Sequence, residues 1–249
     1  MKIKTETMVM FNLFLKNDNH MISSIKSTAR TAGLLYLLQI PLGVFGIIYV
    51  PKFLIDKGSL SQTIDNFSSN EFIFRLSIVS AIICALVTIA TAVYISKILK
   101  VVNHNIAKWI VIFTLILAPI TMINELNNVA ILLIIQKSKY TVGFSNKETE
   151  ALLYLFLNLH EYGIKMINIF FGLWLLPMGY LVIKSKYIPQ IVGYLLLITC
   201  VGYLIDFVLL FLFSSLRITI SDFTWIGEVI MVLWLLTVGV KTNEFLKYF

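Results

Sequence analysis

Ionisable side chains stand inside long apolar stretches of this sequence, where water would not solvate them. An imidazole, a carboxylate and an amine, those of His160, Glu161 and Lys165, directly precede the apolar run IFFGLWLLPMGYLVIK. Other apolar runs hold further carboxylates: Glu125, Asp206 and Glu228. Because histidine exchanges protons near neutral pH and a neighbouring carboxylate can orient it, these residue types could transfer protons or bind a polar ligand.

The spacing of polar residues indicates two polar helix faces. One face follows positions i, i+3, i+7 and i+10 and comprises Asn158, Glu161, Lys165 and Asn168. Within it, Glu161 precedes Lys165 in the order that favours an ion pair. The preceding apolar run holds a second stripe: Thr121, Asn124, Glu125 and Asn128. A charge at the centre of a bilayer costs about 2.5–3.5 kcal/mol on insertion scales, so we expect the two stripes to face each other.

The composition predicts an all-α integral membrane bundle. Hydrophobic residues make up 59% of the chain and charged residues 13%, whereas soluble domains carry about 25% charged residues. The mean hydropathy is +0.89. Strands that alternate apolar and polar residues, as in an outer-membrane barrel, are not visible. The net charge of +7 comes from basic residues at the ends of apolar runs, which favours membrane lipids over nucleic acid as partners.

Apolar runs long enough to cross a bilayer number about six. They lie at about 31–50, 72–98, 108–135, 151–183, 188–214 and 223–240. We expect residues 1–26 to be a mobile cytoplasmic tail and residues 27–249 to be a single transmembrane domain. Translation could also start at Met21, because MISSIKSTAR leads directly into the first span.

Basic residues predict the orientation. With the N-terminus inside, twelve lysines and arginines lie on the cytoplasmic side and seven outside, and Lys165 lies within a span. The sequence therefore predicts that both chain ends are cytoplasmic. A helix rises 1.5 Å per residue, so Glu125, 17 positions after Lys108, lies roughly 25 Å above the inner anchor.

The same depth argument places the other ionisable residues in the outward half of the bilayer. The sequence thus predicts one outward-facing polar pocket, lined by Arg75, Glu125, Asn128, His160, Glu161, Lys165, Asp206 and Glu228. The alternative is a buried ion network that fixes the register of the helices.

Known cofactor and metal motifs are absent from the sequence. It has no P-loop, no GxGxxG after a strand, no GxSxG and no HExxH, so we predict no cofactor and no metal. Three roles remain open for His160: a hydrogen-bonded core residue, a general base, or a metal ligand with Glu125, Glu161 and Asp206. The two cysteines, Cys84 and Cys200, lie in apolar runs without CxxC spacing, which is typical of packing residues.

Several segments resemble the bacterial membrane family known as domain of unknown function 4386 (DUF4386). They are ARTAGLLYLLQIPLGVF, FRLSIVS, FLNLHEYG, FFGLWLLPMGYL, GYLID and GEVIMVLWLLTVGVK. The matching motif positions are His160, Tyr162, Gly163, Phe171, Gly172, Pro189, Gly193, Tyr203, Asp206 and Glu228. Glu161, Lys165 and the NELNN at 124–128 depart from the family's pattern. The resemblance implies a multi-pass plasma-membrane protein and no particular activity.

Three functions remain open. The first is binding or transport of a small polar solute or a lipid headgroup through the outward pocket. The second is an intramembrane enzyme that acts on a lipid or isoprenoid, with His160 as acid or base. The third is a structural or accessory membrane protein in which the charges only specify packing. The sequence does not predict the oligomeric state.

Overall fold

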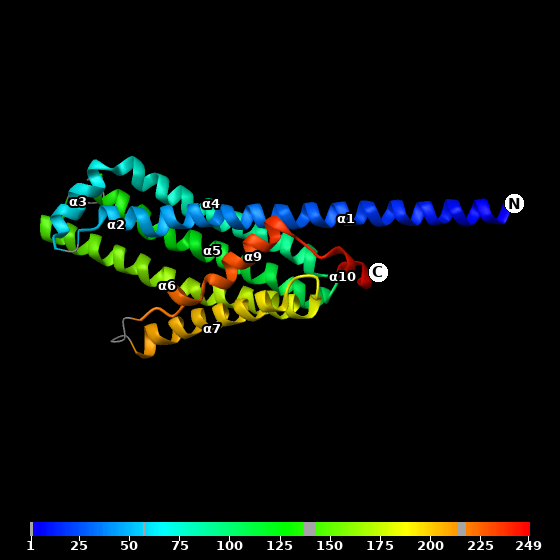
Figure 1. Ribbon diagram of the computed structural model, residues 1–249. Helices are drawn as coiled ribbons and strands as arrows, with labels where there is room; N and C mark the ends of the chain where they lie inside the picture. Colours follow the sequence, from blue (N-terminus) through cyan, green and yellow to red (C-terminus); the bar gives the residue numbers. More distant parts are fainter. Residues whose placement is uncertain (1, 57, 137–142, 214–217) are drawn as a thin grey trace.

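The protein is an all-α bundle of long helices (Figure 1). The computed structural model describes residues 2–56, 58–136, 143–213 and 218–249, and side chains from residue 21 onward. No β-strand occurs among these residues, so the predicted fold class is confirmed. The helices are α1 (Lys2–Gly43), the π-helix η1 (Val44–Tyr49), α2 (Val50–Leu54), α3 (Leu60–Ser69), α4 (Glu71–Leu99), α5 (His104–Ile135), α6 (Asn146–Ser185), α7 (Gln190–Leu212), α8 (Ser221–Thr224), α9 (Ile226–Thr237), α10 (Thr242–Phe245) and the 3-10 helix η2 (Leu246–Tyr248).

Five helices in the described part of the chain are long and apolar enough to cross a bilayer, namely Met21–Leu54, Glu71–Leu99, His104–Ile135, Asn146–Ser185 and Gln190–Leu212. A sixth candidate span joins Ser221–Thr237 to Thr242–Tyr248, which turns away by 96°. The predicted spans agree with these helices to within a few residues at most ends. The predicted boundary between tail and domain, at residues 26 and 27, falls inside α1.

The six candidate spans form a ring in which each helix packs against two neighbours. α1 contacts α4, α4 contacts α5, α5 contacts α6 and α6 contacts α7, while α9 lies between α7 and α1. The C-terminus and the connections α4–α5 and α6–α7 lie at one end, here called the terminal end (Figure 1). The opposite end, here called the α3 end, holds α3 and the start of α6.

Local sequence signals fix where the two central helices begin. Asn103 caps α5, because its side chain accepts a hydrogen bond from the N–H of Ile106 at 3.0 Å. Ser145 and Glu148 form a capping box at the start of α6, in which each side chain accepts from the other residue's N–H. These caps set the register of the helices that carry the site described below.

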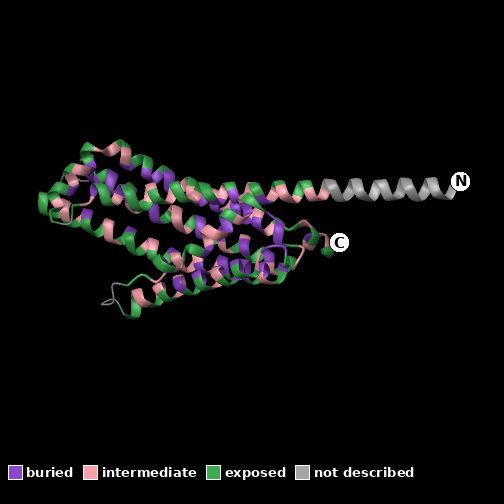
Figure 2. Ribbon diagram, in the orientation of Figure 1, coloured by how far each residue is buried: buried purple, intermediate pink, exposed green. Residues whose placement is uncertain are grey.

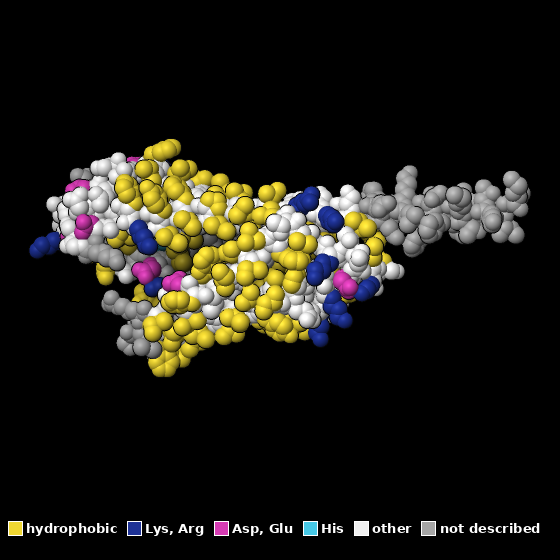
Figure 3. Space-filling model, viewed as in Figure 1, with side chains coloured by type: hydrophobic (Ala, Val, Ile, Leu, Met, Phe, Trp, Pro, Cys, Tyr) yellow, Lys and Arg dark blue, Asp and Glu magenta, His cyan; other side chains and the backbone are white. Residues whose placement is uncertain are grey.

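The outer faces of the helices are exposed (Figure 2), and many side chains on them are apolar, as contact with lipid requires (Figure 3). In Figure 3, hydrophobic side chains form a broad band across the molecule, and charged side chains gather toward its ends. Large apolar side chains are exposed, for example Ile123, Leu126 and Ile191, each by more than 60%. The coarse prediction of a membrane protein is therefore confirmed, because these faces would not be stable in water.

Two separate apolar cores hold the helices together. The core near the terminal end includes Trp174 and Leu181 of α6, and it also contains the buried free Cys200. The core near the α3 end includes Phe74 of α4 and Leu153 of α6. Along α5 and α6, buried polar residues occupy the region between these cores. The bundle therefore has a polar layer inside it.

Candidate functional site

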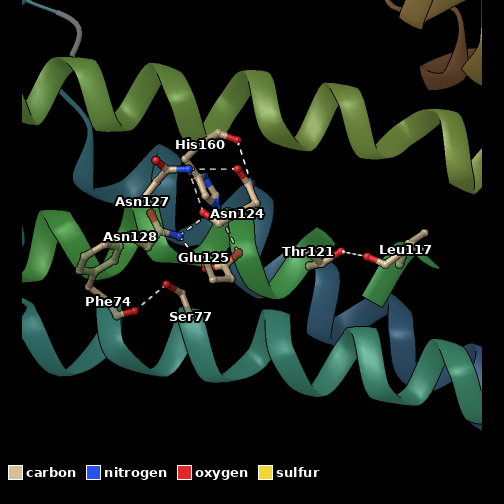
Figure 4. A network of polar contacts seen from close by, with 9 residues as sticks. All are labelled: Phe74, Ser77, Leu117, Thr121, Asn124, Glu125, Asn127, Asn128 and His160. Atoms are coloured by element: carbon tan, nitrogen blue, oxygen red, sulfur yellow. Dashed lines mark hydrogen bonds and ion pairs between the residues drawn. The ribbon is translucent and has the colours of Figure 1, made fainter. Parts of the chain in front are cut away.

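The polar layer contains a hydrogen-bonded network between α5 and α6 (Figure 4). His160 Nε2 lies 3.1 Å from Glu125 Oε1 and 3.0 Å from Asn128 Nδ2. Asn128 Nδ2 also donates to Glu125 Oε2 at 2.7 Å. These three side chains, together with Asn124, are called the polar network below. It joins an imidazole, a carboxylate and amides from two consecutive helices.

Helical spacing explains why these side chains meet. On α6, His160 lies on a stripe of buried residues seven positions apart, which includes Leu153, Ile167 and Trp174. On α5, Glu125 and Asn128 lie one turn apart and face the same neighbour. Glu125 is only 4% exposed and His160 only 8%. The network therefore belongs to the interior of the bundle.

Asn124 ties the network to the backbone of α6. Its Nδ2 donates to the carbonyl oxygen of His160 at 3.1 Å, and Asn127 Nδ2 donates to Asn124 Oδ1 at 3.2 Å. The approach is close because residue 163 is glycine: a Cβ there would lie 1.8 Å from Asn124 Oδ1. Gly163 thus provides the space in which Asn124 can reach α6.

The two contacts of His160 Nε2 cannot both be good hydrogen bonds at once. If Nε2 carries a proton, it donates to Glu125 and repels the N–H of Asn128. If Nε2 lacks a proton, it accepts from Asn128 and faces a carboxylate oxygen unless Glu125 is protonated. The network therefore has alternative proton arrangements, which is chemically suited to proton exchange or to a ligand that replaces one contact.

The buried surroundings of the network strengthen each of its hydrogen bonds. Across from Glu125, α4 presents Phe74 and Ser77, and the Ser77 hydroxyl donates to the Phe74 carbonyl at 2.6 Å (Figure 4). Both α4 residues are buried. In such a low-dielectric interior a satisfied polar contact is stronger, and an unsatisfied one more costly, than in water.

The predicted ion pair of α6 forms, but it lies on the outer surface of the bundle. Lys165 Nζ is 2.6 Å from Glu161 Oε1, with 45% and 63% of the two side chains exposed. The expectation that this stripe faces the stripe of α5 is wrong. α5 instead meets the face of α6 that carries His160, which is displaced around the helix from Glu161 and Lys165.

Arg75 also lies away from the polar network. Its Nε is 2.6 Å from Glu71 Oε1, and Gln136 Nε2 donates to the same oxygen at 2.8 Å. Arg75 and Glu71 form an exposed pair at the beginning of α4, at the α3 end. The pair joins the start of α4 to the end of α5 through Gln136.

Asp206 and Glu228 occupy two further places. Asp206 accepts from the N–H groups of Ile220 at 2.6 Å and Ser221 at 2.9 Å, so it holds the start of α8. Glu228 accepts from the hydroxyls of Tyr36 and Tyr203. These two carboxylates therefore contribute to the packing of the last span, and neither contacts His160.

The eight predicted pocket residues thus do not form one cluster. The structure brings together Glu125, Asn128 and His160, and it separates them from the other five. The prediction of one common pocket is wrong in this respect, because spacing along one helix does not reveal which face a neighbouring helix covers. Whether any of the eight residues binds a ligand stays a prediction.

The structure gives several residues contacts that the sequence did not predict. Asn124 lay in the predicted stripe, but its bond to a backbone carbonyl carries no sequence signal. Tyr36, which holds Glu228, has none either. For Gly163 a signal existed, because a glycine in a helix interior often marks a close approach of another element.

The described part of the chain holds no metal-binding cluster, and its apolar groove lies away from the predicted pocket residues. Within the described residues, no three His, Cys, Asp or Glu side chains lie close enough together to hold a metal ion. A shallow groove of about 380 Å³ lies on α7, between Ile198, Val201 and Thr224, and is almost entirely apolar. None of the eight predicted residues lines this groove.

Comparisons with known proteins agree with the sequence resemblance. A protein of Archaeoglobus fulgidus (strain ATCC 49558 / DSM 4304 / JCM 9628 / NBRC 100126 / VC-16), described as uncharacterized, is 42% identical over 76 residues. The match covers 30% of this chain and 46% of that relative, so less than half of the relative's length is spanned. No solved structure matches the chain. The family profile described as Domain of unknown function (DUF4386) matches residues 31–239, and the chain therefore belongs to this family.

Proposed function

We propose that this protein binds a small polar solute at the polar network between α5 and α6 and transports it across the membrane. The observation that supports the proposal most strongly is the contact of His160 with Glu125, two ionisable groups from different helices in the interior of an apolar bundle. Ionisable groups inside a membrane bundle are costly, and they commonly mark pathways for ions, protons or substrates.

The chemistry of the network favours a solute with a protonated amino group or a hydroxyl group. Glu125 offers two acceptor oxygens, and the described contacts of the His160 ring all use Nε2. An ammonium or hydroxyl donor could replace Asn128 as the partner of Glu125, and His160 could accept a proton from that donor or return one to it. A lipid headgroup with an ammonium group has the same chemistry.

The orientation and the membrane belong to the same proposal. With both chain ends in the cytoplasm of a bacterial cell, the network lies nearer the outer face, because Glu125 is 10 residues from the end of α5 and 21 from its start. Single cysteines at residues 60 and 145 should then react with an impermeant thiol reagent in intact cells, and cysteines at 104 and 186 should not. Labelling of the second pair alone would reverse the orientation.

Thermal stability of the purified protein in lipid nanodiscs provides a binding test. Short primary amines, amino alcohols and amino acids are added to the wild type and to the Glu125→Gln and His160→Gln variants. We expect at least one solute to raise the Tm of the wild type and to lose this effect in both variants. The control is Glu161→Gln, which removes an equally charged but exposed carboxylate of α6 and should keep the effect.

The same assay distinguishes the possible sources of the ligand. If soluble amines have no effect but nanodiscs with phosphatidylethanolamine stabilise the wild type more than Glu125→Gln, the ligand is a headgroup. If no solute and no lipid distinguishes the wild type from both network variants, the binding proposal is refuted and the network serves packing only.

A second candidate function is supported by the same imidazole–carboxylate contact. A carboxylate that orients a histidine is the arrangement expected of a general acid or base, here one that would act on a lipid or isoprenoid. Lipid extracts of a deletion strain should then accumulate one unmodified lipid, and a His160→Gln gene should fail to reverse this. Identical lipid profiles with and without the gene would exclude the enzyme.

A further inference from the structure

A second carboxylate lies half-buried at the junction of three helices. Glu228 belongs to the first turn of α9. Its Oε2 accepts from the hydroxyl of Tyr36 on α1 at 2.5 Å, and its Oε1 accepts from the hydroxyl of Tyr203 on α7 at 3.2 Å. The carboxylate therefore connects α9 to both of its neighbours.

The backbone beside Glu228 departs from a regular helix. Trp225 separates α8 from α9, and the N–H of Glu228 bonds to the carbonyl of Trp225, three residues back, at 3.0 Å. The carbonyl of Thr224, which a regular helix would use, instead accepts from the Thr199 hydroxyl at 2.5 Å. Such local tightening within a helix often marks a hinge or a functional site, and interrupted helices carry ion sites in many transporters.

The ionisable neighbours of Glu228 are the two tyrosines, and the acids Asp206 and Asp222 lie near Tyr203. None of the ion pairs among the described residues includes Glu228. α7 contributes the acid Asp206 one turn beyond Tyr203, and α8 contributes Asp222. On the α6 side, Trp174 packs edge-on against Tyr36, with the ring centres 5.4 Å apart. Glu228 thus has hydrogen-bond donors but no cationic partner in the described part of the chain.

We propose that Glu228 is a proton-binding site, distinct from the polar network at His160, and that its protonation controls how firmly α9 is held to α1 and α7. Both tyrosine hydroxyls donate their protons to the carboxylate. Because these protons point at Glu228, the site suits a carboxyl group better than a metal cation, which would need oxygen lone pairs. The ionised carboxylate accepts both bonds. When it takes up a proton from water, the protonated oxygen becomes a donor, and the bond from the tyrosine on that side is lost or reversed.

Infrared difference spectroscopy of the protein in lipid nanodiscs, between acidic and alkaline buffer, tests this site. A protonated carboxyl group gives a C=O band that the carboxylate lacks. Because the chain contains 13 Asp and Glu residues, the Glu228 band is identified by difference. We expect one component of the wild-type carboxyl bands to be missing in Glu228→Gln and to be retained in Asp206→Asn. In Tyr203→Phe, which preserves the ring and its packing, the band should shift to higher frequency because a hydrogen bond to the carboxyl group is missing.

Two controls separate this site from the polar network. Glu125→Gln should leave the Glu228 band in place, so the proposal stands even if the solute-binding function fails. Sodium and potassium at fixed pH should not remove the band. Identical carboxyl bands in the wild type and Glu228→Gln, a Glu228 band unaffected by Tyr203→Phe, or a Glu228 band abolished by either cation would each overturn the proposal.

Discussion

Gly163 offers a sharp test of the contact between α5 and α6. An alanine at this position would place its Cβ 1.8 Å from Asn124 Oδ1 and 2.5 Å from Asn124 Cγ. Asn124 would have to withdraw, and it would lose its bonds to the His160 carbonyl and to Asn127. Gly163→Ala should therefore destabilise the protein, although alanine is the better helix former.

The magnitude follows from three opposing effects. Replacing a helical glycine by alanine stabilises by about 1 kcal/mol. Losing the Asn124 hydrogen bond costs about 0.5–1.5 kcal/mol, and leaving its buried amide without partners costs about 1–3 kcal/mol more. We expect Gly163→Ala to lower the free energy of unfolding by about 1–3 kcal/mol. An Asn124→Ala background removes the three atoms that would lie nearest to the new Cβ, and the same substitution should stabilise by up to about 1 kcal/mol there.

The assay is reversible unfolding by dodecyl sulfate in mixed lipid–detergent bicelles, applied to wild type, both single variants and the double variant. Gly43→Ala is the matched control, since Gly43 lies in a helix and a Cβ there would meet only Cys84 Sγ at 4.0 Å. The predicted result is a change of sign between the two backgrounds. An equal effect of Gly163→Ala with and without the Asn124 side chain would refute the reasoning.

Three further predictions concern other contacts. Asp206→Ala should destabilise by about 2–4 kcal/mol, because the N–H groups of Ile220 and Ser221 at the start of α8 lose their acceptors away from water, and equal stability in the bicelle assay would contradict this. Gly227→Ala should weaken the α7–α9 contact, since its Cβ would lie 2.7 Å from the Leu195 backbone; cross-linking between the two helices should fall, and unchanged cross-linking would argue against it. Replacing Glu161 and Lys165 together by glutamine should leave stability nearly unchanged, and a large loss would show that this exposed pair matters.

The membrane architecture could be predicted from the sequence because it depends on composition and length. A run of apolar residues must be helical in lipid to satisfy its own backbone groups, so the spans follow from hydropathy alone. The interruption at Trp225 could not be predicted in this way. It depends on the Thr199 hydroxyl of α7, which donates a hydrogen bond to the carbonyl of Thr224.

The site was predicted less well than the fold, for a geometric reason. The types of residue were right, and Glu125, Asn128 and His160 do meet. The face of α6 that meets α5 differs from the predicted one, because the stripe with Glu161 and Lys165 lies at the surface, whereas the buried residues that include His160 recur every seven positions. In a membrane bundle a polar stripe on a helix need not be buried. Long charged side chains such as those of Glu161 and Lys165 can also pair at the surface.

The most direct test of the polar network is nitrogen NMR of the His160 ring. The chain has three histidines, so ¹⁵N-histidine labelling with His20→Gln and His104→Gln leaves one imidazole signal pair. We predict that the Nε2 resonance is that of a hydrogen-bonded nitrogen and that it moves in Glu125→Gln but not in Glu161→Gln. The resonances of a freely solvated imidazole, unchanged by Glu125→Gln, would contradict the contact on which the proposed function depends.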